Sequence, residues 1–229
     1  MIIAPALLAA NPGCLAKEVR RVAKSGAEWL HFDIMDGHFV PAISVGPSTV
    51  QAVRKLTRML FDIHLLCAKP QALVEDFARA GADQITVHVE LGEQVLPLLW
   101  KIRACGKRVG LAINPPTGIA LAKPYLDKLD TLLIMTVNPG ADTEPFIYET
   151  LPKIQQAEAW RRERGLAYRI QVDGGLDPDT IGDCAAAGAD VFVCGNGIFH
   201  QRSLRRAVGK YRKAALKRAS GSSSPEMAN

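Results

Sequence analysis

The chain has 229 residues, 48% of them hydrophobic and 22% charged, and a net charge of +5. These values are typical of a globular protein that is long enough to bury one large core. No apolar run reaches the roughly 18 residues of a membrane span, so we expect neither a membrane-embedded protein nor a membrane partner.

The five cysteines are odd in number and scattered, and no two of them form a C-x-x-C pair. This usage favours reduced thiols in a cytoplasmic protein over a disulfide framework or a cysteine-based zinc site. The apolar start of the chain has no basic region before it and is interrupted by Pro5. We therefore expect a buried first strand there and not a signal peptide.

Short β-branched or leucine-rich runs alternate with longer amphipathic segments along the chain. Leu15–Ser25 and Val74–Ala80, for example, have the 3.6-residue period of amphipathic helices. The expected strands cover residues 2–8, 29–33, 60–65, 84–88, 108–113, 131–136, 168–172 and 191–194. Eight strands with helices between them predict an α/β fold, a single (β/α)8 TIM barrel. A doubly wound open sheet is the alternative, but no G-x-G-x-x-G motif follows the first strand.

Three segments repeat the order glycine, alanine, acid, strand. Gly26, Gly81 and Gly188 each stand between an expected helix and the next expected strand. Glycine readily adopts the left-handed conformation that ends a helix. The spacings are close to multiples of one strand–helix unit, which supports the barrel.

The C-terminal segment, residues 201–229, has eight basic side chains and one acid, Glu226. A basic helix of this kind is one means of binding nucleic acid or an anionic surface. Tyr211 is the one aromatic residue among these charges and no binding motif is present, so we expect a solvated outer face and no nucleic-acid partner. The small, polar residues 219–229 predict a disordered tail, which places the barrel domain at residues 1–218.

In a (β/α)8 barrel the functional side chains gather where the strands end. The second expected strand leads into His31-Phe32-Asp33-Ile34-Met35, and alternation directs His31, Asp33 and Met35 to one face. A histidine and an aspartate in a barrel lumen are costly to bury unless they are ionically satisfied. This pattern indicates a functional site at the end of the second strand.

The third and seventh expected strands offer similar side chains. Asp62 and His64 share one face of the third strand, and Asp173 ends the seventh, directly before two glycines. Together, His31, Asp33, His64 and Asp173 make a suitable site for Zn²⁺, Fe²⁺, Mn²⁺ or Co²⁺. Taken singly, each histidine is also explained as a hydrogen-bonded core residue and Asp173 as a turn cap. We expect Asp62 to be a supporting or structural carboxylate.

Four segments, read in order, resemble the ribulose-phosphate 3-epimerase family. They are Leu30–Pro41, Asp62–Leu65, Met135–Gly140 and Val172–Gly175, and the resemblance runs from about Ile3 to Phe199. The resemblance implies a barrel of the ribulose-phosphate-binding type with one divalent metal bound by His31, Asp33, His64 and Asp173, and no organic cofactor. It also implies that Asp33 and Asp173 are the catalytic acid and base, in a protein that forms homo-oligomers.

Epimerisation suits these residues. The hydrogen on the carbon beside a ketone is weakly acidic, and its removal leaves an enediolate that a metal stabilises. Two carboxylates on opposite faces of this planar intermediate, Asp33 and Asp173, remove a proton from one side and return one to the other. The expected reaction is therefore inversion at C3 of a ketose phosphate, with ribulose 5-phosphate and xylulose 5-phosphate as the default pair.

The resemblance also assigns contacts with the substrate. Methionines of the family lie beneath the intermediate, a role that Met35 and Met135 match, whereas Leu66 stands where methionine is usual. Backbone N–H groups of glycine-containing loops are expected to hold the phosphate. The remaining substrate-binding residues that the resemblance implies are His64, Gly140, Gly174, Gly175, Gly195 and Asn196.

Two parts of the chain depart from the family pattern. The sixth loop has Ala141-Asp142-Thr143-Glu144-Pro145-Phe146 where the family has an aromatic residue and two glycines. The acids Asp142 and Glu144 would repel a phosphate dianion unless they point outward. Near the first strand, Ala6 replaces a usual serine and Ala9-Ala10-Asn11 replaces Ser-Ala-Asp, so a hydroxyl that contacts the substrate is missing.

We keep several alternatives. Residues 159–166 are similar to the allulose-6-phosphate epimerase branch, which favours a hexulose phosphate, and the acids of the sixth loop favour an unphosphorylated ketose. A metal-dependent sugar-acid phosphate decarboxylase shares the scaffold but depends on a lysine where this chain has His31 and His64. A non-catalytic sugar-phosphate-binding barrel is a different class, and it would not need both Asp33 and Asp173.

Overall fold

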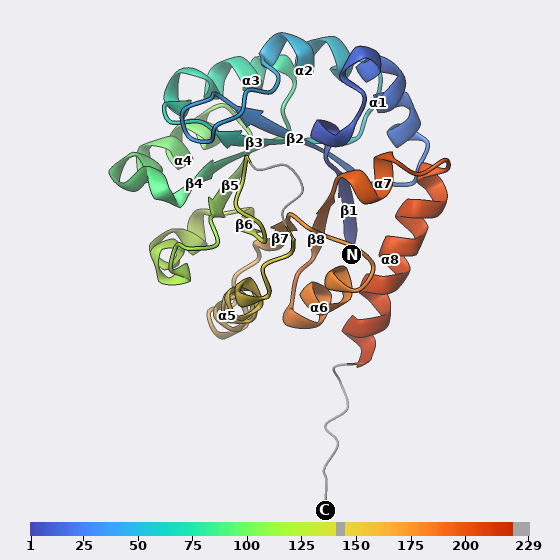
Figure 1. The fold of residues 1–229 in the computed structure, drawn as a ribbon. Coiled ribbons are helices and arrows are strands. Elements are labelled where there is room, and N and C mark those ends of the chain that lie inside the picture. The colour runs from blue at the N-terminus through green and yellow to red at the C-terminus, as the bar shows by residue number, and fades with distance from the viewer. Residues whose placement is uncertain (141–144, 222–229) are drawn as a thin grey trace, which may run out of the picture.

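The computed structural model describes residues 1–140 and 145–221, with side chains to residue 218 in the last helix. Eight parallel strands form one sheet in the order β1-β8-β7-β6-β5-β4-β3-β2. They are β1 (Ile2–Pro5), β2 (Trp29–Met35), β3 (Leu60–Leu66), β4 (Gln84–His88), β5 (Arg108–Ile113), β6 (Thr131–Met135), β7 (Arg169–Asp173) and β8 (Val191–Cys194). A parallel bridge between Ala6 and His31 joins the two edges, so the sheet forms a nearly closed barrel (Figure 1). The predicted (β/α)8 barrel is confirmed.

Helices surround the strands and connect them. They are α1 (Leu15–Ala23), α2 (Pro47–Arg54), α3 (Val74–Ala80), α4 (Val95–Ala104), α5 (Leu151–Glu163), α6 (Thr180–Ala187), α7 (Asn196–Phe199) and α8 (Leu204–Gly221). The 3₁₀ turns are η1 (Leu7–Ala9), η2 (Pro12–Cys14), η3 (Pro70–Ala72), η4 (Val89–Gln94), η5 (Ile119–Lys128) and η6 (Tyr148–Thr150). The η5 segment joins β5 to β6 without an α-helix, because Pro124 inside it lacks a backbone donor.

Each strand is buried on both faces. Phe32, Phe61 and Ile63 belong to the hydrophobic core that the strands form with the surrounding helices. The opposite face of the strands contributes fully buried polar side chains to the barrel lumen, where they are stable only if they are hydrogen-bonded. Among these are His31, Asp62, Gln84, Thr131 and Gln171.

Seven of the eight expected strands agree with the structure to within two residues at each end. The first strand was expected over residues 2–8 but ends at Pro5. Beyond it the backbone turns into η1, where the N–H of Ala9 donates to the carbonyl of Ala6 at 3.1 Å. Residues 6–8 are all apolar, and apolar residues occur both in strands and in 3₁₀ turns. Hydrophobicity alone therefore could not predict this turn.

The last helix extends past the expected domain boundary. The structure places residues 219–221 in α8, which ends at Gly221, whereas the disordered tail was expected to begin at residue 219. The rest of that expected tail, residues 222–229, lies outside the described residues.

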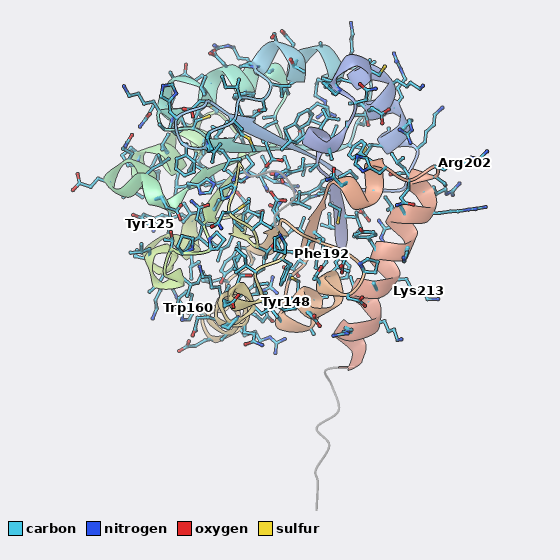
Figure 2. All side chains as sticks on the ribbon, in the orientation of Figure 1. Tyr125, Tyr148, Trp160, Phe192, Arg202 and Lys213 are labelled. Atoms are coloured by element: carbon cyan, nitrogen blue, oxygen red, sulfur yellow. The ribbon has the colours of Figure 1, made fainter. Side chains whose placement is uncertain are left out.

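One face of α8 packs on the barrel and the other carries its charges. Val208 and Tyr211 are buried, whereas Lys213 is exposed. Arg202 and Lys213 lie at the outer margin of the molecule (Figure 2). Within residues 1–140 and 145–221, no helix is both long and apolar enough to cross a membrane.

The repeated glycines all adopt the left-handed conformation. Gly26, Gly81 and Gly188 have φ values of 85°, 108° and 115°. Gly81 and Gly188 directly follow their helices, as predicted, whereas two residues separate Gly26 from the end of α1 at Ala23.

The acid in each repeat holds the start of a neighbouring strand, a role that was not predicted. Asp83 accepts from the N–H of Phe61 at 2.7 Å, and Asp190 accepts from the N–H of Ile170 at 2.9 Å. Each acid also pairs with an arginine, which supports the carboxylate. The pairs are Arg212–Glu28, Arg54–Asp83 and Arg161–Asp190.

Gly110 is required by close packing inside the barrel. A Cβ atom there would lie 2.0 Å from Oγ1 of Thr86 and 3.1 Å from its Cα. We expect Gly110→Ala to lower the free energy of unfolding by about 1–3 kcal/mol, because the lumen is overpacked. Thermal and urea unfolding measure this, with Gly209→Ala in α8 as the control. No atom lies within 4 Å of the added group at Gly209, so that change should stabilise the helix by roughly 0.5–1 kcal/mol. Equal effects of the two substitutions would contradict the packing argument.

Candidate metal and acid–base site

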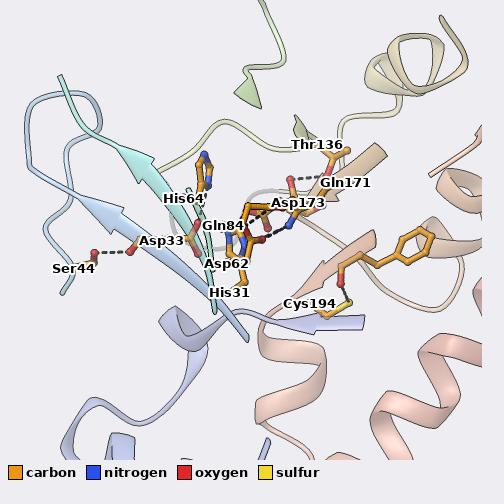
Figure 3. A network of polar contacts seen from close by, with 12 residues as sticks. His31, Asp33, Ser44, Asp62, His64, Gln84, Thr136, Gln171, Asp173 and Cys194 are labelled. Carbon is orange, nitrogen blue, oxygen red and sulfur yellow. Dashed lines mark hydrogen bonds and ion pairs between the residues drawn. The ribbon is translucent and has the colours of Figure 1, made fainter. Parts of the chain in front are cut away.

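Four metal-capable side chains meet at the carboxyl ends of β2, β3 and β7. His31 and Asp33 come from β2, His64 from β3, and Asp173 from the last position of β7. One ligand atom from each lies within 4.8 Å of the others (Figure 3). All four side chains point into the barrel at the edge where the parallel strands end. The structure therefore brings together the four predicted metal ligands.

The ring of His31 is held by Asp62, the carboxylate expected to have a supporting role. Nδ1 of His31 lies 2.7 Å from Oδ2 of Asp62, and both side chains are fully buried. The other ring nitrogen, Nε2, lies 3.2 Å from Oδ1 of Asp33 and 3.7 Å from Oδ2 of Asp173. A ring that donates from Nδ1 to a carboxylate is oriented to bind a metal through Nε2.

Asp62 is itself fixed by side-chain amide groups from β4 and β7. Gln84 and Gln171 donate to its two oxygens at 2.8 Å and 2.6 Å. Gln84 in turn accepts from the hydroxyl of Thr131 at 2.8 Å. Burial alone would raise the pKa of Asp62, but His31 and the two glutamines lower it below its ordinary value. Asp62 is therefore an ionised, immobile support for His31.

His64 is supported by two further residues, which were not predicted. Its Nδ1 lies 3.1 Å from Oδ1 of Asp33, and its Nε2 lies 2.8 Å from Nε2 of His88. Nδ1 of His88 lies 3.0 Å from Oε2 of Glu90. His88 ends β4 on the same face as Gln84, so the alternation used for the second strand would have found it.

The two aspartates have pKa values shifted in opposite directions. Burial alone would raise the pKa of Asp33, but His31 and His64 lower it far below its ordinary value. Burial and the charge of Asp33 raise the pKa of Asp173 to about 8. At neutral pH one carboxyl group is therefore ionised and the other mainly protonated.

The site favours positive charge. Burial alone would lower the pKa of His31, but Asp33 and Asp62 raise it well above its ordinary value. Two nitrogen and two oxygen donors fit the predicted Zn²⁺, Fe²⁺, Mn²⁺ or Co²⁺. A divalent ion held by His31, Asp33, His64 and Asp173 would neutralise carboxylates that protons otherwise neutralise.

A cavity of about 310 Å³ adjoins these ligands. Asp33 and Asp173 line it, whereas His31 and His64 are fully buried and do not. His64 was predicted to contact the substrate as well as the metal, and its side chain does not reach the cavity. The other residues predicted to bind substrate all line it: Met35, Met135, Gly140, Gly174, Gly175, Gly195 and Asn196.

Three of the residues that depart from the family pattern border this cavity. Ala6, Ala9 and Leu66 all line it. The missing hydroxyl near the first strand is therefore missing from the wall of the cavity. Residues 141–144, which include the acids Asp142 and Glu144, lie outside the described residues.

The glycine pair after β7 forms a close-packed part of the cavity wall. Gly174 and Gly175 have φ values of 116° and 63°. A Cβ atom on Gly175 would lie 2.8 Å from the backbone nitrogen of Phe146. The hydroxyl of Thr136 donates to the carbonyls of Asp173 and Gly174, at 2.9 Å and 2.6 Å. These contacts fix the backbone conformation of residues 173–175, which line the cavity.

Solved structures share the fold at low sequence identity. KGPDC from Streptococcus mutans has a TM-score of 0.70 at 15% identity, over 94% of this chain and 97% of that one. Orotidine 5'-phosphate decarboxylase from Pyrococcus horikoshii has a TM-score of 0.68 at 15% identity, over 94% and 99%. At this identity the likeness shows the barrel architecture.

Sequence relatives show the family. The profile of the "Ribulose-phosphate 3 epimerase family" matches residues 2–199. The chain is 41% identical over 216 residues to the ribulose-phosphate 3-epimerase of Synechocystis sp., covering 93% of this chain and 94% of the relative. It is 37% identical to the Bacillus subtilis enzyme of the same name, covering 92% and 97%. The chain, with its four clustered ligands beside one cavity, therefore belongs to the ribulose-phosphate 3-epimerase family, whose named members are isomerases.

Proposed function

We propose that this chain is a metal-dependent ketose-phosphate 3-epimerase that interconverts ribulose 5-phosphate and xylulose 5-phosphate. The observation that carries the proposal is the pair Asp33 and Asp173, which reach one cavity from strands that are not neighbours in the sheet. The names of the relatives support the substrate and the reaction type.

The two aspartates supply the proton transfers. In one direction Asp33 acts as the base that removes the C3 proton and Asp173 as the acid that returns one, and the roles exchange in the other direction. Removal of the C3 proton leaves a planar 2,3-enediolate, and a proton delivered to its opposite face inverts the centre. His31, Asp33, His64 and Asp173 would hold a divalent ion, whose charge stabilises the enediolate oxygens.

The remaining walls of the cavity bind and shield the sugar. Met35 and Met135 present apolar surface that keeps water from the intermediate. The phosphate would lie against the backbone of Gly140, the Gly174–Gly175 pair and the Gly195–Asn196 segment, because N–H groups of such loops bind anions. Phosphate recognition needs an experiment of its own, because the sequence of the sixth loop departs from the family pattern.

Gly175→Ala tests the phosphate site. The new Cβ would press on the backbone at Phe146, and we expect the KM for ribulose 5-phosphate to rise about tenfold with a smaller change in kcat. Gly106→Ala is the matched control, because Gly106 also has a positive φ, of 70°, but nothing lies within 4 Å of its added group. Steady-state kinetics of the two variants decide the point. An equal rise in KM for a free ketose would assign the effect to the cavity as a whole and not to phosphate.

Deuterium exchange tests the reaction itself. Metal-reconstituted protein is incubated in D₂O with ribulose 5-phosphate, allulose 6-phosphate and the unphosphorylated ketoses, and the C3 proton is followed by NMR. We expect rapid loss of the C3 signal for ribulose 5-phosphate and formation of its epimer. Preference for allulose 6-phosphate or a free ketose would reassign the substrate. No exchange with any ketose and any of the four metals would refute the epimerase proposal.

The setting of the enzyme follows from the same proposal. We infer that it acts on a small sugar phosphate in the cytoplasm, as a homo-oligomer and without nucleic acid or membrane partners. The five free cysteines are compatible with a reducing compartment. Light scattering measures the oligomeric state.

A further inference from the structure

The metal ligand His64 lies at the inner end of a polar chain that we call the Glu90 relay: Glu90, His88 and His64. The planes of the two imidazole rings are inclined by 21°, and their centroids are 4.9 Å apart. The two Nε2 atoms are 2.8 Å apart. These values fit nearly coplanar rings that meet edge to edge, so an N–H of one ring points along the lone pair of the other.

A metal ion bound to Nδ1 of His64 would fix the direction of each hydrogen bond in this relay. A carboxylate accepts but does not donate, so Nδ1 of His88 donates to Glu90. With the proton of His88 on Nδ1, its Nε2 offers a lone pair to Nε2–H of His64, 2.8 Å away. Nδ1 of His64, which lies 3.1 Å from Oδ1 of Asp33 and among the other metal ligands, is then the nitrogen that would bind the ion in place of a proton.

We propose that Glu90, acting through His88, holds His64 in the tautomer that binds the metal through Nδ1. Glu90 and His88 are thus positioning residues, since neither is among the four ligands and neither lines the substrate cavity. The relay has the same purpose for His64 that Asp62 has for His31, with one extra imidazole between ligand and carboxylate. This inference rests on the proposed metal site.

The carboxylate of Glu90 is held in place by hydrogen bonds from the loop after β5. Its Oε1 accepts from the backbone N–H of Asn114 at 2.8 Å, and the hydroxyl of Thr117 bonds to the same carboxylate. Lys153 donates to the backbone carbonyls of Asn114, Pro115 and Thr117, at 3.0, 2.6 and 2.6 Å. The loop after β5 is therefore fixed to α5, and the carboxylate is held facing His88.

Glu90→Gln should reverse the direction of the hydrogen bonds in the relay, while the size of the side chain at residue 90 stays nearly the same. The single remaining oxygen is required by the N–H of Asn114, so the amide NH₂ faces Nδ1 of His88. His88 then accepts at Nδ1 and carries its proton on Nε2, opposite the Nε2–H of a metal-bound His64. Two donors face each other, and relieving that conflict requires a proton on Nδ1 of His64, where the metal binds. Loss of such supporting groups typically weakens metal binding 10–100-fold.

The test measures zinc affinity by competition with a chromophoric chelator. We expect the zinc dissociation constant of Glu90→Gln to rise about 10–100-fold, and that of Glu93→Gln to match the wild type. Glu93 is the control because it lies in the same 3₁₀ turn and is exposed. ¹⁵N NMR of the zinc-loaded proteins supplies a second readout: the proton of His88 is expected on Nδ1 in the wild type and on Nε2 in Glu90→Gln.

A second pair of variants keeps the test independent of Glu90→Gln. His88→Leu removes the acceptor for His64 and should weaken zinc binding about 10–100-fold. His88→Gln places an amide oxygen near the former Nε2 and should recover most of that loss. Equal zinc affinities of Glu90→Gln and Glu93→Gln, or a wild-type His88 protonated on Nε2, would overturn the inference. A wild type that binds no zinc, manganese, iron or cobalt would instead refute the proposed metal site, before any variant is compared.

Discussion

Asp173→Asn should lower kcat by about 10²–10⁴, because the variant loses the carboxyl group that exchanges a proton with one face of the intermediate. The substitution should also separate proton exchange from inversion. Asp33 still removes the C3 proton from one epimer and returns deuterium to the same face. We therefore expect Asp173→Asn to deuterate one epimer in D₂O without converting it, and Asp33→Asn to do so with the other.

Two measurements make this outcome specific to acid–base chemistry. Both aspartates are also proposed metal ligands, so the metal content of each variant is determined and assays are run at saturating metal. Asp179→Asn is the matched control, an exposed aspartate six residues farther along the chain. A fully metal-loaded Asp173→Asn that still deuterates both epimers at the wild-type ratio would rule out two-base catalysis.

Removal of the divalent ion should lower kcat/KM by roughly 10³-fold or more, since a metal contributes several kcal/mol to stabilisation of an enediolate charge. Chelation should also lower the melting temperature, because a ligand that binds the folded state stabilises it. We expect both losses to be reversed at one equivalent of Zn²⁺, Fe²⁺, Mn²⁺ or Co²⁺ per chain.

His31→Gln provides the comparison for this experiment. It removes a ring nitrogen from the ligand cluster and leaves the acceptor Asp62 without its imidazole donor. One equivalent of metal should then fail to restore activity, whereas a large excess should restore part of it. Full activity of the wild type after exhaustive chelation, with no bound metal by elemental analysis, would remove the metal from the mechanism.

The barrel and the clustering of the four candidate ligands were predictable because each depends on short-range patterns. Alternation along β2 is enough to place His31 and Asp33 on one face, and parallel strands that end at one edge bring Asp173 to them. The turn after Pro5 was not predictable, because apolar residues 6–8 fit a strand and a 3₁₀ turn equally well. A boundary of this kind depends on tertiary packing.

The supports of the ligands were harder to predict than the ligands. Gln84, Thr131 and Gln171 come from three different strands, and what joins them is their shared contact network around Asp62 inside the lumen. No spacing in the sequence encodes such a network. His88 carried a usable signal, since it ends β4 as an inward-facing histidine, but its link to Glu90 depends on how the chain turns after the strand.

Closure of the barrel determines how far apart the two aspartates stand. Across the bridge that closes the barrel, β8 and β1 lie between β7, which carries Asp173, and β2, which carries Asp33. The first half of the chain supplies three of the four ligands, yet the fourth comes only when the circle is completed through the bridge between Ala6 and His31. Neither half of the chain holds both aspartates of the proposed acid–base pair. Recovery of activity during refolding would therefore report when the two halves of the barrel join. A measurement of helix content cannot detect this stage, because helices form from local segments.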